Sequence, residues 1–298
     1  MKSVRIESEN RERQALYRKA IGIAVVGNIL LAAAKGVLAW ATGSSALFAD
    51  AANSLSDTLY SVMMGGGLYL AQRPPDETHP QGHSRVEPLV SLFIAGMMAT
   101  AGATALIQSI RRFLAGELAI QPGWPTVVLV LGMLIKVGMY VWSNRVGSQA
   151  RSPAILASAR DNLADILTSF AALLGVWGSN FIHPFLDPAA GVLVALWIFR
   201  ATWEIAAENL GYLTGRGADA ALIEHIVQAT SSIDGVEDVH RVIADYVGPM
   251  LRVDMRIRVM GTITLEHAHE ISEQVNQVVE MLPDVDVAYV HVEPLPMD

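Results

Sequence analysis

The chain has 298 residues, of which 52% are hydrophobic and 17% are charged, and its mean hydropathy is +0.37. This composition is unlike that of an ordinary soluble domain and indicates a membrane protein. The net charge of −8 argues against a nucleic-acid partner, and a chain with no cysteine can form neither disulfides nor thiolate metal sites, so any metal must be held by oxygen or imidazole nitrogen.

Six apolar segments approach the roughly 20 residues that a helix needs to cross a bilayer. They cover residues 20–41, 45–71, 88–110, 124–142, 153–177 and 188–205. The polar N-terminus has no signal-peptide cleavage site after the first segment, so we expect this segment to stay in the membrane. Arginine and lysine gather before the first segment and after the second and fourth, with Arg111 and Arg112 as an exception. By the positive-inside rule, both termini are expected in the cytoplasm of a cell whose inner membrane holds the protein.

After about residue 209 the pattern becomes that of a small soluble domain. Helical periodicity covers 218–231 and 265–281, while alternating apolar residues predict strands at 236–246, 250–259 and 285–292. The order helix, strand, strand, helix, strand predicts an α+β sandwich. We therefore expect a six-helix transmembrane domain at 1–208 and a cytoplasmic domain at 209–298.

Two helical segments carry acidic and amide residues at the same spacing. Asp161 and Asp165 lie four residues apart within 153–177, and Asn53 and Asp57 lie four apart within 45–71. This spacing places each pair on one face of a helix, and an ionisable group in hydrocarbon is costly. A bound cation is the simplest compensation, although polar side chains also join membrane helices by hydrogen bonds alone.

The two pairs are expected at the same depth. The second segment runs inward and the fifth outward, which puts both pairs roughly 12 to 18 Å from a membrane face, near the centre of a core about 30 Å thick. Asn53, Asp57, Asp161 and Asp165 then supply four oxygen ligands at one level. Three neighbouring carboxylates repel one another unless a cation or protons intervene.

These features resemble the cation diffusion facilitators, a family of divalent-metal/proton antiporters. The resemblance rests on six spans, the paired motifs ending in Asp57 and Asp165, and the small C-terminal domain, and it covers essentially the whole chain. It implies a homodimer in the lipid bilayer whose C-terminal domain has a ferredoxin or copper-chaperone-like αββαβ fold. It also implies that metal leaves the cytoplasm in exchange for protons, by alternating access around Asn53, Asp57, Asp161 and Asp165.

The ligand types bear on which metal is carried. Zinc-selective members usually have histidine in the site, whereas this chain has only Asn and Asp there, a set that suits harder ions such as Mn²⁺. Within the family, paired aspartates on the fifth span are associated with manganese. We therefore favour Mn²⁺, with Fe²⁺, Zn²⁺ and Co²⁺ as alternatives, since zinc also accepts carboxylate oxygen.

The resemblance extends to two further groups of residues. Asp76, His79 and His83, in the loop between the second and third segments, match the family's cytoplasmic loop metal site, with Glu77 as a further ligand. A charged loop rich in proline and glycine has the same composition without metal. In the tail, the residues that align with metal-binding positions are His240, Asp254, His269, His291 and Glu293. His269 is preferred to His267 by alignment, and surface histidines without metal are the alternative reading.

Arg160 departs from the family pattern, because relatives often have an apolar or aromatic gate residue next to the first aspartate of this pair. Its charge would repel an approaching cation, or it would pair with Asp50 or Asp187. Two other functions therefore stay open. One is a transport-impaired metal sensor or scaffold of the same fold, and the other is a monovalent cation/proton antiporter, because an all-oxygen site could admit Na⁺. An intramembrane aspartyl protease is disfavoured, because the chain has no Gly-x-Gly-Asp stretch.

Overall fold

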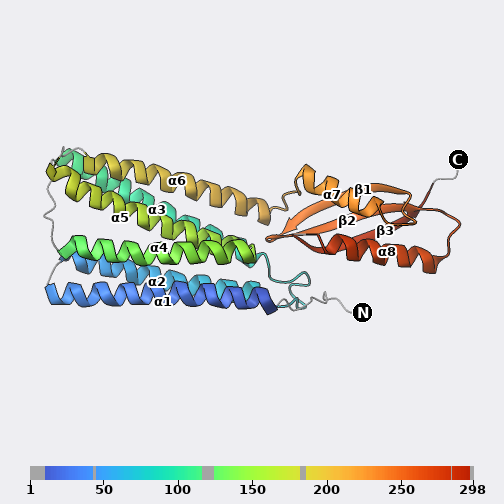
Figure 1. Ribbon diagram of the computed structural model, residues 1–298, viewed down its shortest axis with the longest axis horizontal. Helices are drawn as coiled ribbons and strands as arrows, with labels where there is room; N and C mark the ends of the chain where they lie inside the picture. Colours follow the sequence, from blue (N-terminus) through green and yellow to red (C-terminus); the bar gives the residue numbers. More distant parts are fainter. Residues whose placement is uncertain (1–10, 43–44, 116–123, 182–185, 283, 296–298) are drawn as a thin grey trace. The chain divides into compact units, whose positions relative to one another are not determined.

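A computed structural model describes residues 11–42, 45–115, 124–181, 186–282 and 284–295. The chain divides into two compact units, Met1–Asn209 and Leu210–Asp298. The first unit is made of long helices, and the second combines helices with a three-stranded sheet (Figure 1).

The helices of the first unit lie side by side as a bundle (Figure 1). They are α1 (Arg11–Thr42), α2 (Ser45–Ala71), α3 (Val86–Ala115), α4 (Trp124–Ala150), α5 (Pro153–Phe181) and α6 (Leu186–Leu213). Each contains one predicted apolar segment, and α2 has the predicted bounds. The other helices run further than predicted, because a helix continues into polar flanking residues as long as its backbone bonds are satisfied. Over the described residues, α1, α3 and α6 contain stretches long and apolar enough to span a bilayer.

Polarity in the bundle is arranged as expected for a membrane protein. Large apolar side chains such as Leu30, Leu59 and Leu134 are exposed on its outside. Polar side chains such as Asn28, Ser61 and Lys136 are buried. Lipid can solvate the apolar exterior, but every buried polar group needs a partner inside the protein.

Helix α2 packs closely on α3, and a short capped connection leads from α4 into α5. A Cβ at Gly67 of α2 would come within 2.2 Å of Val90 on α3, so only glycine lets these helices approach. Helices α4 and α5 are joined by Arg151, which has a φ of 49°, and Ser152. The Ser152 hydroxyl accepts a hydrogen bond from the Ile155 N–H and thereby caps α5.

The second unit has the predicted αββαβ order. Its elements are α7 (Ala220–Ser231), β1 (Asp238–Val247), β2 (Met250–Val259), α8 (Leu265–Glu280) and β3 (Val285–Pro294). The sheet order is β1-β2-β3, with β1 antiparallel and β3 parallel to β2. Gly248, with a φ of 71°, forms part of the two-residue turn between β1 and β2.

Both helices cover one face of this sheet. Alternate β2 residues Leu251, Val253, Met255 and Ile257 are fully buried against Val275 and other apolar residues of α8 and α7. The intervening β2 residues therefore face away from the helices. The α+β prediction is confirmed, and the register of the three strands determines which tail residues share the open face.

Candidate functional site

Helices α2 and α5 bring three carboxylates together near the middle of the bundle. Asp57 lies on α2, and Asp161 and Asp165 lie one turn apart on α5. Asp161 interacts electrostatically with both Asp165 and Asp57. The predicted association of the two aspartate-bearing segments is therefore present. The Asn53 side chain lies outside the described part of the structure.

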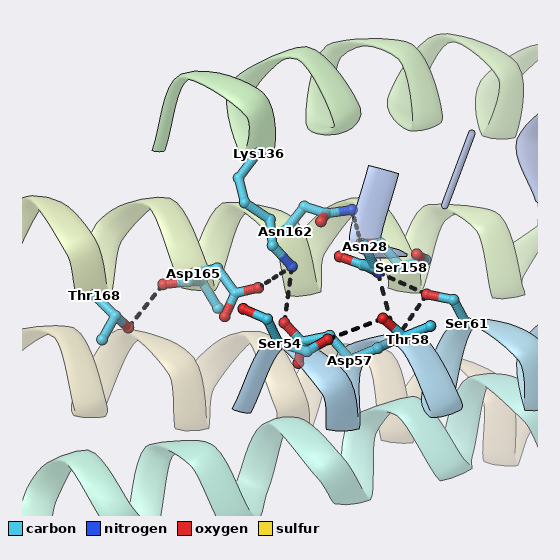
Figure 2. Close-up of polar contacts among 11 residues, drawn as sticks. Asn28, Ser54, Asp57, Thr58, Ser61, Lys136, Ser158, Asn162, Asp165 and Thr168 are labelled. Carbon is cyan, nitrogen blue, oxygen red and sulfur yellow. Dashed lines mark hydrogen bonds and ion pairs between the residues drawn. The ribbon is translucent and has the colours of Figure 1, made fainter. Parts of the chain in front are cut away.

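Lys136 of α4 joins this cluster and was missed by the sequence reasoning. Its ammonium Nζ lies 2.6 Å from Asp165 Oδ2 and donates a hydrogen bond of 3.2 Å to Asp57 Oδ2 (Figure 2). It also interacts electrostatically with Asp161. The sequence does contain a signal for it, a lone lysine deep in the apolar segment 124–142. An ammonium group in hydrocarbon is as costly as a carboxylate and equally needs a partner.

Buried polar residues position α2 against α1. Asn28 Nδ2 of α1 donates to Ser61 Oγ at 2.7 Å, and Ser61 Oγ donates to the Asp57 carbonyl oxygen at 2.9 Å (Figure 2). Asn28 Nδ2 also lies 3.4 Å from the same carbonyl. These contacts hold the turn of α2 that carries Asp57 at a fixed distance from α1.

Tyr60 adds a further polar group beside the carboxylates. It is buried one turn after Asp57 and interacts electrostatically with Asp161. The side chain of Ser158 on α5 lies within hydrogen-bonding reach of its hydroxyl. Tyr60 therefore links α2 to the part of α5 that carries Asp161.

A second buried network ties three helices together away from the aspartates. Glu87, in the first turn of α3, accepts hydrogen bonds from Tyr17 Oη of α1 at 2.7 Å and from Ser152 Oγ at the start of α5. All three side chains are buried. The buried Glu87 carboxylate therefore holds together the N-terminal parts of α1, α3 and α5.

The loop between α2 and α3 gathers the predicted residues Asp76, His79 and His83. Their potential ligand atoms all lie within 4.8 Å of one another, and within the described ranges they are the sole such group of three. Asp76 Oδ1 lies 3.5 Å from His79 Nδ1, and Asp76 Oδ2 lies 3.4 Å from His83 Nε2. Glu77 is exposed and is not part of this group.

Hydrogen bonds hold the Asp76 carboxylate in one orientation. Asp76 Oδ1 accepts from the Thr78 hydroxyl and from the backbone N–H groups of Thr78 and His79. These bonds, chiefly the one from the Thr78 hydroxyl, lower the pKa of Asp76 to about 2. His83 Nδ1 lies 3.3 Å from the Arg73 carbonyl oxygen, and donation there would leave Nε2 to bind metal.

Within the described residues of one chain, the tail residues do not form a group of three neighbouring ligand atoms. His240, Asp254 and His291 are exposed on β1, β2 and β3, whereas His269 is exposed on α8, the helical layer. Glu293 Oε1 lies 3.1 Å from Arg256 Nη1 and 3.8 Å from His291 Nε2. The His240 ring lies 3.3 Å from Arg258 Nη2.

These contacts place two arginines among the proposed tail ligands. A cation bound there by one chain would be repelled by Arg256 and Arg258. His267, the alternative to His269, pairs with Glu270 at 3.2 Å. The tail set therefore differs from the loop set, because Asp76, His79 and His83 include no arginine or lysine.

Arg160 is half-buried and, among the residues described, has no hydrogen-bond or ion-pair partner. The side chains of Asp50 and Asp187, its predicted alternatives, lie outside the described part of the structure. Nothing in its surroundings explains a charge beside Asp161.

Two family profiles together match nearly the whole chain. The cation efflux transmembrane domain matches residues 21–214, and the cytoplasmic domain of cation efflux proteins matches residues 218–295. Both matches agree with the division of the fold into a helical bundle and an α+β unit.

Three microbial relatives resemble the chain over almost their full lengths. An uncharacterized transporter of Methanocaldococcus jannaschii is 33% identical, over 92% of this chain and 97% of its own length. The manganese efflux system proteins MneS and MneP of Bacillus subtilis are 28% and 27% identical, over 92% and 95% of this chain and 94% and 98% of their own lengths.

Among solved structures, a variant of the MamM CTD is 31% identical over 26% of this chain and 100% of its own length, with a TM-score of 0.26.

Proposed function

The chain belongs to the cation efflux family, the cation diffusion facilitators, and on this premise we propose that it exports a divalent metal cation from the cytoplasm in exchange for protons. The observation that carries the proposal is the meeting of Asp57, Asp161 and Asp165 from two helices inside the membrane bundle. Carboxylates in that place are costly unless they bind a cation. Asn53 is proposed as the fourth ligand, on sequence alone.

Mn²⁺ is the proposed cargo. The described side chains at the site offer carboxylate and hydroxyl oxygen and no imidazole, and oxygen ligands suit Mn²⁺. Two relatives are named manganese efflux proteins. Fe²⁺, Zn²⁺ and Co²⁺ remain the alternatives, because generic sites bind them more tightly than Mn²⁺.

Protons are the proposed counter-ion. Metal binding requires ionised carboxylates, so protons compete with metal for the same oxygens. A transporter that returns with protons on these oxygens moves protons in the direction opposite to the metal. Both termini are proposed to lie in the cytoplasm, and the chain is proposed to act as a homodimer through its 209–298 domain.

The loop group Asp76, His79 and His83 is proposed as a second, regulatory metal site. Three potential ligand atoms within 4.8 Å suit one ion. Metal binding by the tail residues is proposed only between two chains, since Arg256 and Arg258 lie among them in one chain.

A transport-impaired sensor is the second candidate, because Lys136 already fills the space between two carboxylates. Uptake by proteoliposomes under a pH gradient separates the candidates. Export predicts Mn²⁺ movement that stops when the gradient is collapsed. A sensor predicts Mn²⁺ binding without movement, and a monovalent antiporter predicts Na⁺ movement instead.

A further inference from the structure

Lys136 is a charged side chain that the proposed transport function does not require. It is 7% exposed and lies near the middle of α4, between the apolar residues Ile135 and Val137. An ammonium group in such surroundings is stable only beside negative charge. Lys35 of α1 also interacts electrostatically with Asp57.

The Lys136 ammonium lies where a bound cation would lie. It reaches from α4 to one oxygen of Asp57 on α2 and one oxygen of Asp165 on α5, at 3.2 and 2.6 Å (Figure 2). It therefore bridges the two helices that carry the candidate metal ligands. A divalent cation bound by both Oδ2 atoms would sit in the same space, at roughly 2.0 to 2.2 Å from each.

We propose that Lys136 is a tethered occupant of the transport site, whose ammonium bridges Asp57 and Asp165 when metal is absent and leaves them when metal binds. This inference rests on the proposed function of the three aspartates. Two cations cannot share the space between the same two oxygens without strong repulsion. The four-carbon stem of lysine is flexible, so the ammonium can move while its backbone stays in α4.

Two consequences follow for transport. By competing for the oxygens, Lys136 weakens metal binding, and by returning to them it promotes metal release. Removing the charge should therefore tighten metal binding and slow turnover together. A lysine that only stabilised the fold would instead lower the amount of folded protein and leave the affinity of that fraction unchanged.

The test uses the full-length protein in proteoliposomes, with Mn²⁺ uptake measured as KM and kcat. Lys136→Met, which has a similar length and no charge, should lower KM by about tenfold or more and should also lower kcat. Lys136→Arg keeps the charge and should stay near the wild-type KM. The matched control is Arg145→Met, which removes a charge from the exposed side of the same helix and should change neither constant.

An unchanged or raised KM in folded Lys136→Met protein would overturn the proposal. Equilibrium Mn²⁺ binding to the purified protein separates this failure from that of the proposed function. If the wild type transports no metal, tighter binding by Lys136→Met at the aspartate site, measured in a His83→Ala background that removes the loop site, still supports displacement, whereas equal binding refutes it.

If Lys136→Met and Lys136→Gln both fail to fold, a structure of the wild-type protein tests the displacement of Lys136. A Mn²⁺-loaded structure should place Nζ more than about 4 Å, the limit of an ion pair, from both Asp57 and Asp165. An ammonium that stays within that limit of both carboxylates while Mn²⁺ is bound to them would refute displacement.

Discussion

Lys136 Nζ on α4 lies 2.6 Å from Asp165 Oδ2 on α5 and so neutralises one carboxylate of a three-aspartate cluster. The contact is a close ion pair between a buried ammonium group and a carboxylate. The charge repulsion expected from the sequence is thus relieved in part by the protein itself. While Lys136 stays in place, protons need only balance the charge that remains.

Replacing Asp57, Asp161 or Asp165 with Asn should abolish metal transport while the protein still folds. Mutations around metal ligands cost 10- to 100-fold, so loss of a ligand should lower Mn²⁺ uptake by about 100-fold or more. Uptake into proteoliposomes measures this. The matched control is Glu204→Gln, since Glu204 is an exposed acid of α6 paired with Arg200. Wild-type uptake by Asp161→Asn and Asp165→Asn protein would remove these residues from the site.

Glu87→Ala should destabilise the bundle by about 2 to 4 kcal/mol, because it removes the charged acceptor of two buried hydroxyls. Glu87→Gln keeps one acceptor oxygen and should lose less. The free energy of unfolding in detergent, followed with denaturant, checks both. Glu204→Ala, at an exposed helix pair, should cost no more than about 0.5 kcal/mol. Equal losses for Glu87→Ala and Glu204→Ala would contradict a structural role for the buried network.

His79→Ala and His83→Ala should each lower the Mn²⁺ or Zn²⁺ bound per chain by one ion and leave transport active. The reason is that the loop site shares no ligand with the aspartate cluster of the bundle. Metal analysis after dialysis measures the bound ion. His225→Ala, which alters an exposed histidine of α7, is the control. An unchanged metal count in both loop variants would show that the loop binds none.

Asp76 should remain ionised to lower pH than an ordinary aspartate. Its folded pKa of about 2 lies below 3.8, the ordinary pKa of an aspartate. The stability that the ionised carboxylate gives the loop is therefore fully present above about pH 4 and is lost as the pH falls through about 2.

Thr78→Val tests the cause of that shift, since the Thr78 hydroxyl makes the largest contribution. It should raise the pKa of Asp76 toward the ordinary value. Carboxyl NMR of protein labelled at aspartate, assigned with Asp76→Asn, measures the change. An identical pKa with Thr78→Val would show that backbone N–H groups alone lower it.

The sequence predicted the elements well because their patterns are strong. Strand β2 has the predicted bounds, since every second residue is buried and those between are half-buried or exposed. Helix α1 begins at Arg11 rather than residue 20, because hydropathy marks the apolar core of a helix and not its polar ends. The aspartates were predicted to meet, since spacing and depth can both be read from a helical pattern.

Other features depend on geometry that only the fold supplies. The contact of Lys136 with Asp57 depends on how α4 is rotated about its axis, although a buried lysine was itself a readable signal. His240 lies at an irregularity in the β1–β2 register, between Val239 and Arg241, so strand alternation did not predict its contact with Arg258. The low pKa of Asp76 depends on a turn that directs two backbone N–H groups toward one oxygen.

Anomalous scattering at the manganese edge, from the full-length protein loaded with Mn²⁺, tests the central claim most directly. The account predicts a peak between the carboxylates of Asp57 and Asp165, within bonding distance of both, with the Lys136 ammonium displaced. A protein that transports Mn²⁺ but shows its peaks only at Asp76, His79 and His83, with Lys136 still paired to both aspartates, would contradict it.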